Sequence, residues 1–367
     1  MVERLLTVIA VTLGALALSA ALVPASRRLA QQVGAVDQPG PRKIHAAAMP
    51  RLGGAAVFAG FTVVVAFGYL AAPLLQHSDW LRAAWAEPLS MLREAYRVQG
   101  KLLAVLGGGA LVFLVGALDD ALQARFPVWA KAAGQVLAAL LLLAGDVRTS
   151  FLPVPLLNDL VTVVWVVGMT NAFNLLDNLD GVSAGVGSVA SAILLVNAWA
   201  LGEFFICLLL GAFLGSLLGF LLHNFHPATV FLGDGGALFV GYMMASLTLL
   251  ERYVSHASSS LFPILMPVLV LALPLIDTTS VVVIRLRERR PIYVGDSRHL
   301  AHRLLSLGFS PRATALFLYL ATFCLGLGAL LLPHATTAQG LVILLQAGAF
   351  VALFLVLLFF ERRKVPR

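Results

Sequence analysis

Two adjacent carboxylates end a long apolar run, because Asp119 and Asp120 lie in the sequence GALDDALQARFP. Neighbouring carboxylates repel each other and are costly to dehydrate. Such a pair suits a divalent cation, or a general base whose proton affinity its neighbour raises. A simple capping role on a loop stays open for one of the two. As a pair, they indicate a site for cation binding or for proton transfer.

A second polar segment reads NAFNLLDNLDG, in which Asn171, Asn174, Asp177 and Asp180 recur every three residues. On a continuous helix this spacing keeps side chains on one face. We therefore expect a single ridge of amides and carboxylates against an otherwise apolar wall. Helix capping and a turn around Asp180 and Gly181 explain at most the last two of the four residues.

The third acidic position is Asp234, which lies between glycines in HNFHPATVFLGDGGALFVG, just before an apolar run. The first turn of a helix offers free backbone N–H groups and the positive end of the dipole, which favour an anion such as a phosphate. The carboxylate could hold a metal ion beside that anion. The GDGG sequence alone is also typical of a capped turn.

The last large polar segment reads RLRERRPIYVGDSRHLAHRLLSLGFS. In it, Arg298, His299, His302 and Arg303 recur at spacings of three and four residues. This spacing predicts a basic helical face that could clamp a pyrophosphate. Membrane topology accounts for the arginines that begin the segment, but it does not account for the histidines.

The rest of the chain around these polar segments is too apolar for a water-soluble globular protein. Of its 367 residues, 60% are hydrophobic and 12% are charged, against about 25% charged in an ordinary soluble domain. A helix needs about 20 apolar residues to cross a bilayer, and the chain has eleven candidate runs. They lie at residues 5–23, 55–75, 102–118, 128–144, 154–170, 182–201, 204–222, 236–250, 261–284, 313–333 and 340–360. The sequence predicts an all-α polytopic membrane protein of about eleven transmembrane helices, with residues 1–367 forming one domain.

The positions of lysine and arginine orient the chain in the membrane. With the N-terminus outside and the C-terminus cytoplasmic, 18 of the 25 basic residues fall on the cytoplasmic side, as the positive-inside rule requires. Residues 76–100 then form an external loop, either a plain connector or an amphipathic interfacial helix. The acids named above gather at the cytoplasmic ends of helices, whereas Asp277 lies deeper. A transporter is expected to place ionisable groups near the mid-bilayer, so this pattern favours an enzyme at the cytoplasmic interface.

The net charge and the two cysteines limit the kinds of partner and site that the sequence predicts. The net charge of +7 describes membrane topology rather than a nucleic-acid surface, because apolar runs separate the basic residues. Cys207 and Cys324 both lie inside apolar runs, so we expect neither a disulfide framework nor a thiolate metal site. The expected partner is the lipid bilayer, and no nucleic acid is expected.

Together, the polar segments resemble the polyprenyl-phosphate N-acetylhexosamine-1-phosphate transferases, the membrane superfamily that contains the WecA, TagO and MraY types. The resemblance extends over nearly the whole chain. It rests on five features in one order: DQPGPRKIHAAAMPRLGG in the first inner loop, the pair Asp119 and Asp120, NAFNLLDNLDG, the stretch from Asn224 to Asp234 with FLGD, and GDSRHLAHRLL.

This resemblance implies transfer of a sugar 1-phosphate from a UDP-sugar to undecaprenyl phosphate, with release of UMP. It places the active site on the cytoplasmic face of the bacterial inner membrane, where the reaction initiates a lipid-linked envelope glycan for a cell wall or a lipopolysaccharide O-antigen. It also implies Mg²⁺ as the cofactor, with Mn²⁺ as a substitute. A homodimer is expected from the relatives, although no interface can be read from the sequence.

The family's roles fall on matching positions of this chain. By resemblance, Asp119 and Asp120 deprotonate or orient the lipid phosphate, and Asp177 and Asn174 support the metal and the diphosphate. The implied catalytic residues are Asp119, Asp120, Asp177, Asp234 and His299, and the implied metal ligands are Asp234, Asp177 and Asp120. The implied substrate-binding residues are Asp180, Asn224 and Phe231 at the uridine, with Asn174, Lys43, His45, Arg298, His302 and Arg303 at the phosphates.

The late polar segment separates the branches of this superfamily. DSRHLAHRLL is similar to the Asp-x-x-His-x-His-His pattern of the N-acetylglucosamine branch, and the three consecutive histidines of the muramyl-pentapeptide branch are absent. UDP-N-acetylglucosamine is therefore the expected donor, although Ala301 stands where the pattern has a histidine. The alternatives are another UDP-N-acetylhexosamine or UDP-MurNAc-pentapeptide and, in a different class, a membrane transporter or lipid-linked-sugar flippase.

Overall fold

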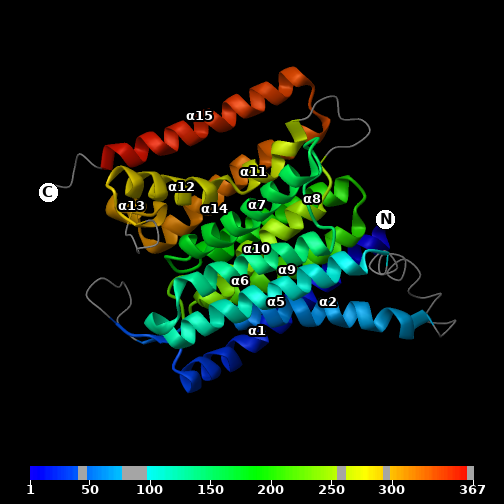
Figure 1. Ribbon diagram of the computed structural model, residues 1–367, viewed down its shortest axis with the longest axis horizontal. Helices are drawn as coiled ribbons and strands as arrows, with labels where there is room; N and C mark the ends of the chain where they lie inside the picture. Colours follow the sequence, from blue (N-terminus) through cyan, green and yellow to red (C-terminus); the bar gives the residue numbers. More distant parts are fainter. Residues whose placement is uncertain (40–47, 77–96, 254–261, 292–297, 362–367) are drawn as a thin grey trace.

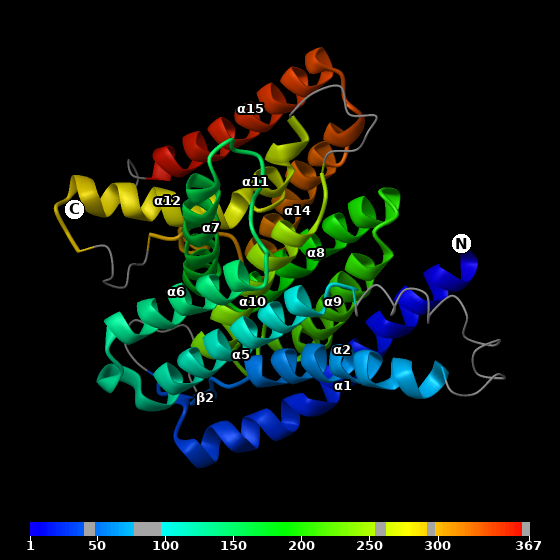
Figure 2. The same ribbon diagram turned by 45° about the vertical axis from the view of Figure 1, so that its right-hand side comes forward.

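A computed structural model of the chain describes residues 1–39, 48–76, 97–253, 262–291 and 298–361. These residues are almost entirely helical, and their long helices lie side by side in one bundle (Figures 1 and 2). The strands β1 (Val36–Asp37) and β2 (Met49–Pro50) form a short antiparallel pair between the first two long helices. The predicted all-α class is confirmed. Lys43, His45 and most of the predicted external loop lie outside the described residues.

Nine described helices are long and apolar enough to cross a membrane. They are α1 (Val2–Val33), α2 (Gly54–Gln76), α5 (Gln99–Leu122), α7 (Pro155–Leu176), α8 (Val182–Ala200), α9 (Phe204–Asn224), α10 (Gly233–Leu250), α14 (Pro311–Ala329) and α15 (Thr337–Glu361). Each coincides with a predicted apolar run. The multi-pass membrane character is therefore confirmed.

The two remaining apolar runs form less regular elements. Helix α6 (Val128–Ala144) is apolar but shorter than the others. Residues Phe262–Val270, which include the 3₁₀ turn η2 (Phe262–Leu265) and α11 (Met266–Val270), join α12 (Ala272–Arg287) at a bend of 71°. The short elements η1 (Gln123–Arg125), α13 (Leu300–Ser306) and η3 (Leu332–His334) complete the fold. The exact number of spans and the sidedness of the termini stay predictions.

Helix α10 lies at the centre of the bundle (Figure 2). In its most apolar stretch 83% of residues are buried, whereas in α15, at the edge of the bundle, 11% are. Small residues let the neighbouring helices approach it closely, as is usual in membrane bundles. On α5, a Cβ added at Gly116 would lie 2.6 Å from the Cα of Gly235. The first turn of α10, which carries Asp234, is therefore tightly held against the end of α5.

Candidate active site

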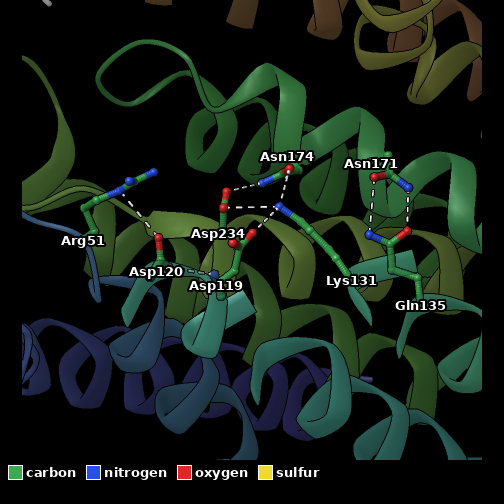
Figure 3. A network of polar contacts seen from close by, with 9 residues as sticks. Arg51, Asp119, Asp120, Lys131, Gln135, Asn171, Asn174 and Asp234 are labelled. Atoms are coloured by element: carbon green, nitrogen blue, oxygen red, sulfur yellow. Dashed lines mark hydrogen bonds and ion pairs between the residues drawn. The ribbon is translucent and has the colours of Figure 1, made fainter. Parts of the chain in front are cut away.

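Four helices bring polar side chains together at one end of the bundle (Figure 3). Asp119 lies in the last turn of α5, Lys131 in the first turn of α6, Asn174 in the last turn of α7 and Asp234 in the first turn of α10. Three of these four residues come from segments that the sequence singled out. The structure therefore brings together the acidic positions that lie up to 115 residues apart in the chain.

Lys131 is the cation at the centre of this cluster. Its Nζ lies 2.9 Å from Asp119 Oδ2 and 3.2 Å from Asp234 Oδ2, and it donates to Asn174 Oδ1 at 3.2 Å. The Asn174 amide in turn donates to Asp234 Oδ1 at 2.7 Å. Sequence reasoning counted Lys131 only as a topological charge. A lone charge inside the predicted span 128–144 was the signal that could have identified it.

Asp120 points to the other side of the cluster and is 1% exposed. Its Oδ2 accepts the backbone N–H of Gly235 at 3.0 Å, and its Oδ1 lies 3.5 Å from Arg51 Nε. Arg51 also lies 3.8 Å from Asp37 in an ion pair. Arg51 is a second residue of the site that sequence reasoning treated as a topological charge, although it directly precedes the LGG of a quoted motif.

The backbone explains how Arg51 reaches Asp120. Phe231 donates its N–H to Pro50 O at 2.8 Å, and Gly53 donates to Phe231 O at 2.9 Å. These bonds join the end of the loop between α1 and α2 to the FLGD segment. Gly233 has a φ of +74°, and a Cβ there would collide with the carbonyl oxygen of Arg51. Only glycine fits this position, because it tolerates both the left-handed backbone and the close approach.

The predicted ridge over NAFNLLDNLDG is wrong in its second half. Helix α7 ends at Leu176, so Asp177 follows the helix and Asp180 lies in the next turn. Asn171 is on the helix but pairs with Gln135 of α6, donating to its Oε1 at 2.6 Å and accepting from its Nε2 at 3.3 Å. Of these four residues, Asn174 is the one that lies on α7 and contacts Lys131 (Figure 3).

A cavity of about 410 Å³ opens beside the cluster, within the usual range for small-molecule sites. The predicted site residues that line it are Asp177, Asp180, Asn224, Phe231, Asp234 and His302. Arg51 lines it as well. The structure therefore gathers the predicted uridine residues, two predicted metal ligands and one predicted phosphate-binding histidine around a single space.

Two of the predicted uridine residues also shape the cavity wall. Asp180 Oδ2 accepts the backbone N–H of Ala228 at 3.1 Å and lies 2.7 Å from Nδ1 of His226. Asn224 accepts the N–H of Gly181 at 3.0 Å through its side-chain oxygen. These bonds tie the turn after α7 to the loop between α9 and α10. They also explain why the chain turns here instead of continuing the helix.

The predicted basic face of the late segment is not one face. Helix α13 begins only at Leu300, and His299 is 4% exposed, with its Nδ1 2.8 Å from Asp277. Arg298 pairs with Glu288 at 2.6 Å, and Arg303 Nε donates to the carbonyl oxygen of Arg298. Of the four predicted basic residues, His302 lines the cavity. Asp277 is thus a partner of this segment and not an isolated intramembrane acid.

Ala301 is buried, with 1% of its surface exposed, and packs into the main apolar core. The structure places this position against other buried side chains. A histidine here would have to displace core side chains, which typically costs about 1–3 kcal/mol. The packing around Ala301 therefore suits an alanine better than the histidine of the family pattern.

The charges at this end of the bundle are unbalanced. Among the described residues, four carboxylates (Asp119, Asp120, Asp177 and Asp234) surround two cations, Lys131 and Arg51. Burial raises the pKa of Asp177 to about 8, and the nearby carboxylates of Asp234 and Asp120 add to this effect. An excess of buried carboxylates favours binding of a further cation.

The donor set fits a magnesium ion that shares its coordination with a substrate. Among the described residues, no group of three histidine, cysteine or carboxylate side chains could hold a metal by itself. Mg²⁺ commonly uses one or two carboxylates and completes its shell with water and substrate phosphates. Asp177 and Asp234, which face the same cavity, offer such a pair of oxygen ligands.

Comparison with known proteins identifies the family. Residues 102–251 match glycosyl transferase family 4, a range that contains Asp119, Lys131, Asn174 and Asp234. A probable undecaprenyl-phosphate N-acetylglucosaminyl 1-phosphate transferase of Bacillus subtilis (strain 168) is 33% identical over 343 residues, which cover 91% of this chain and 87% of the relative. The chain belongs to the polyprenyl-phosphate N-acetylhexosamine-1-phosphate transferases.

Other relatives of this family match most of the chain. A decaprenyl-phosphate N-acetylglucosaminephosphotransferase of Mycobacterium leprae is 33% identical over 328 residues, covering 82% of this chain and 77% of the relative. An undecaprenyl-phosphate alpha-N-acetylglucosaminyl 1-phosphate transferase of Salmonella typhi is 25% identical over 308 residues, covering 81% and 76%. The resemblance that the sequence motifs suggested is confirmed.

Proposed function

We propose that this protein transfers N-acetylglucosamine 1-phosphate from UDP-N-acetylglucosamine to undecaprenyl phosphate, releasing UMP. The carboxylate–lysine cluster beside the cavity carries this proposal, because it joins the ends of four helices at one end of the bundle. A site in this place can meet a lipid-borne phosphate and a water-soluble nucleotide at once. The names of the relatives support both the reaction and the sugar.

The proposed active site faces the cytoplasm from the inner membrane. The distribution of basic residues supports this orientation, because 18 of 25 lie on the same side as the acidic cluster in the predicted topology. The donor nucleotide is made in the cytoplasm, so in this proposal the cavity opens to the cytoplasmic side. Homodimer formation, expected by resemblance, stays a prediction that light scattering of the purified protein tests.

In this proposal the cavity holds the donor. Phe231, part-exposed at the cavity wall, offers an aromatic face for stacking on the uracil, an interaction worth about 1–3 kcal/mol for bases on aromatic side chains. Asp180 has its Oδ2 bonded to Ala228 and His226, and its other carboxylate oxygen is an acceptor for the nucleoside. Arg51 and His302, which both line the cavity, supply donors for the diphosphate.

Mg²⁺ is the proposed cofactor, held by Asp234 and Asp177. The third predicted ligand, Asp120, is bonded instead to Gly235 and Arg51. When bound, Mg²⁺ neutralises charge on the diphosphate that is being cleaved. The excess of carboxylates over cations in the site supports this assignment. Mn²⁺ has similar ligand preferences and is the proposed substitute.

The side chains of the site position two phosphates for a phosphoryl transfer. An oxygen of undecaprenyl phosphate attacks the sugar-linked phosphorus of the donor, and the bond from that phosphorus to the bridging oxygen breaks as UMP leaves. Asp119 and Asp120 orient the acceptor phosphate and take up its proton. Lys131, 2.9 Å from Asp119, offsets the negative charge of the carboxylates and of the acceptor phosphate beside them. Such reactions need positioning and charge neutralisation more than covalent help.

The test is UMP release by the purified protein in detergent with Mg²⁺, undecaprenyl phosphate and a panel of UDP-sugars. We expect UMP with UDP-N-acetylglucosamine, and much less with UDP-N-acetylgalactosamine or UDP-MurNAc-pentapeptide. Preference for another sugar would keep the reaction and change the donor. No UMP from any donor would favour the different-class alternative, because a transporter or flippase breaks no phosphoanhydride bond.

A further inference from the structure

Asp277 is a buried carboxylate that the proposed reaction does not use. It lies on α12, after the 71° bend, and is 0% exposed. An ionisable side chain inside a membrane protein is costly and usually has a specific partner. Both carboxylate oxygens have one: Oδ2 lies 2.8 Å from Nδ1 of His299, and Oδ1 accepts the backbone N–H of Leu300 at 2.6 Å.

These two contacts attach the start of α13 to α12. His299 is the N-cap residue of α13, but its own side chain makes no capping bond. Asp277 instead accepts the N–H of Leu300, the first of the free N–H groups at the start of the helix. The His299 ring is 4% exposed and bonds to the same carboxylate. Asp277 therefore caps α13 from a neighbouring helix.

The other side of α13 reaches the cavity. His302 lies three residues after His299 and lines the same cavity as Asp234 and Asp180. Helix α13 has only seven residues, so a shift at its first residue must move His302 as well. Burial and the adjacent His299 lower the pKa of His302, which favours the neutral ring, and a neutral imidazole donates one hydrogen bond and accepts another.

We propose that Asp277 is a positioning residue of this transferase, which holds His299 and Leu300 so that His302 lies at the donor's phosphates. The inference rests on the proposed function for the role of the cavity, but the contact itself does not. A displacement of about 1 Å can cost a hundredfold in rate when it misplaces a substrate-binding group. Asp277 acts through His302 and is not expected to touch the substrate.

The Asp277→Asn variant tests the contact without removing the side chain. A carboxylate only accepts hydrogen bonds, so Nδ1 of the His299 ring carries a proton in the native contact. In the variant, the amide oxygen can still accept the Leu300 N–H, while the amide NH₂ faces Nδ1 and donates to it. Nδ1 must then be without a proton, which leaves the ring with its proton on Nε2. ¹⁵N NMR of histidine-labelled protein, with the His299→Ala spectrum for assignment, reads this tautomer directly.

A double-mutant cycle tests the action through His302. We expect Asp277→Asn to lower kcat/KM at least tenfold while leaving the unfolding temperature close to that of the wild type. In a His302→Ala background the same substitution should add less than about twofold, because the two residues act in one chain of contacts. Thr279→Ala, an exposed position on α12, is the matched control and should stay within twofold of the wild type.

The outcomes separate this inference from the proposed function. Three outcomes would each overturn the positioning role. One is a wild-type kcat/KM in Asp277→Asn, and another is a fall in kcat/KM that is accompanied by a lower unfolding temperature. The third is a fall in kcat/KM that is as large in the His302→Ala background as in the wild type. An unchanged His299 tautomer in Asp277→Asn would overturn the contact on which it rests. If the wild-type protein releases no UMP, the proposed function fails, and the NMR result still decides whether Asp277 holds His299.

Discussion

The ammonium group of Lys131 lies 3.2 Å from a carboxylate oxygen of Asp234, and this contact joins the first turn of α6 to the first turn of α10. Asp119, from the end of α5, lies 2.9 Å from the same ammonium. A buried lysine needs carboxylate partners to offset the cost of burying its charge, and buried carboxylates need a cation for the same reason. The acidic site is therefore assembled around a cation that belongs to the protein.

Replacing that cation should abolish most of the activity. We expect Lys131→Met to lower kcat/KM by at least about a hundredfold, because removing a charge that stabilises a transferring phosphate costs this much in other enzymes. Lys101→Met is the matched control, since Lys101 is more exposed and lies 3.9 Å from Asp146, its ion-pair partner among the described residues. Lys131→Met with activity within twofold of the wild type would contradict a role in charge neutralisation.

The three acids at the centre of the cluster should each be needed for turnover. We expect Asp119→Asn, Asp120→Asn and Asp234→Asn to lower kcat by at least about a hundredfold, since lost acid-base or metal-binding roles typically cost that much. Asp146→Asn, at a side chain that is 74% exposed, should have no effect. Circular dichroism checks that each variant is folded. Wild-type turnover in any two of the three would rule out a metal-centred site here.

Gly233 should tolerate no side chain. A Cβ there would collide with the Arg51 carbonyl and approach Asp120 Oδ2 to 2.6 Å, so Gly233→Ala should displace Asp120 and abolish UMP release. Gly202 is a matched control, because its φ of +75° is similar but a Cβ there meets nothing within 4 Å. Gly202→Ala should cost about 1–2 kcal/mol in stability and leave kcat unchanged. Equal effects of the two substitutions on kcat would show that backbone strain, and not contact with Asp120, matters.

The uridine assignment predicts effects on binding more than on chemistry. Phe231→Ala should raise the KM for the UDP-sugar and leave kcat nearly unchanged, because stacking is made alike in the ground state and the transition state. Asp180→Ala should raise KM as well, and should lower the unfolding temperature because two bonds to the loop at His226 and Ala228 are lost. Steady-state kinetics with both variants test this. A fall in kcat at unchanged KM in Phe231→Ala would make the assignment wrong.

The opposite end of α10 predicts a pH dependence of stability. Glu251 directly follows α10, is 5% exposed and accepts a hydrogen bond from Asn197 at 2.8 Å. Burial raises its pKa from 4.5 to about 8, and Glu203 adds to the effect. Between these values the folded state binds one proton more than the unfolded state, so the stability from this group is complete at low pH and is lost as the pH rises towards 8.

Melting temperatures measured between pH 5 and pH 9 test this dependence. Glu251→Gln keeps an acceptor for Asn197 but cannot ionise, so its stability relative to the wild type should increase as the pH rises. Glu3→Gln, at an exposed position of α1, should leave the pH dependence unchanged. If the wild type and Glu251→Gln lose stability in parallel across this range, the buried carboxyl is not its source.

The sequence predicts the spans and the acidic positions well for a simple physical reason. Each helix that crosses the membrane must be a long apolar run, so its polar ends are visible without knowledge of its neighbours. Asp119, Asn174 and Asp234 all lie within one or two turns of such an end. Their convergence follows because the ends of adjacent spans meet at the same surface.

The features that the sequence did not predict depend on contacts between distant segments. Helix α7 ends at Leu176 in part because Asn224, at the end of α9, and Ala228, in the loop after it, bond to the turn that follows α7. His299 is turned inward because Asp277 accepts its hydrogen bond. Residue spacing alone cannot show such partners, and it therefore favoured a continued polar helix in one case and a basic face in the other.

The most direct measurement is the identity of both products made by the purified protein. We predict that UDP-N-acetylglucosamine and undecaprenyl phosphate, incubated with the protein and Mg²⁺, yield UMP and undecaprenyl-diphospho-N-acetylglucosamine in equal amounts by mass spectrometry. The Asp234→Asn variant should yield neither. Release of UDP with a lipid monophosphate sugar, or the absence of any sugar-bearing lipid, would contradict transfer of a sugar 1-phosphate by this site.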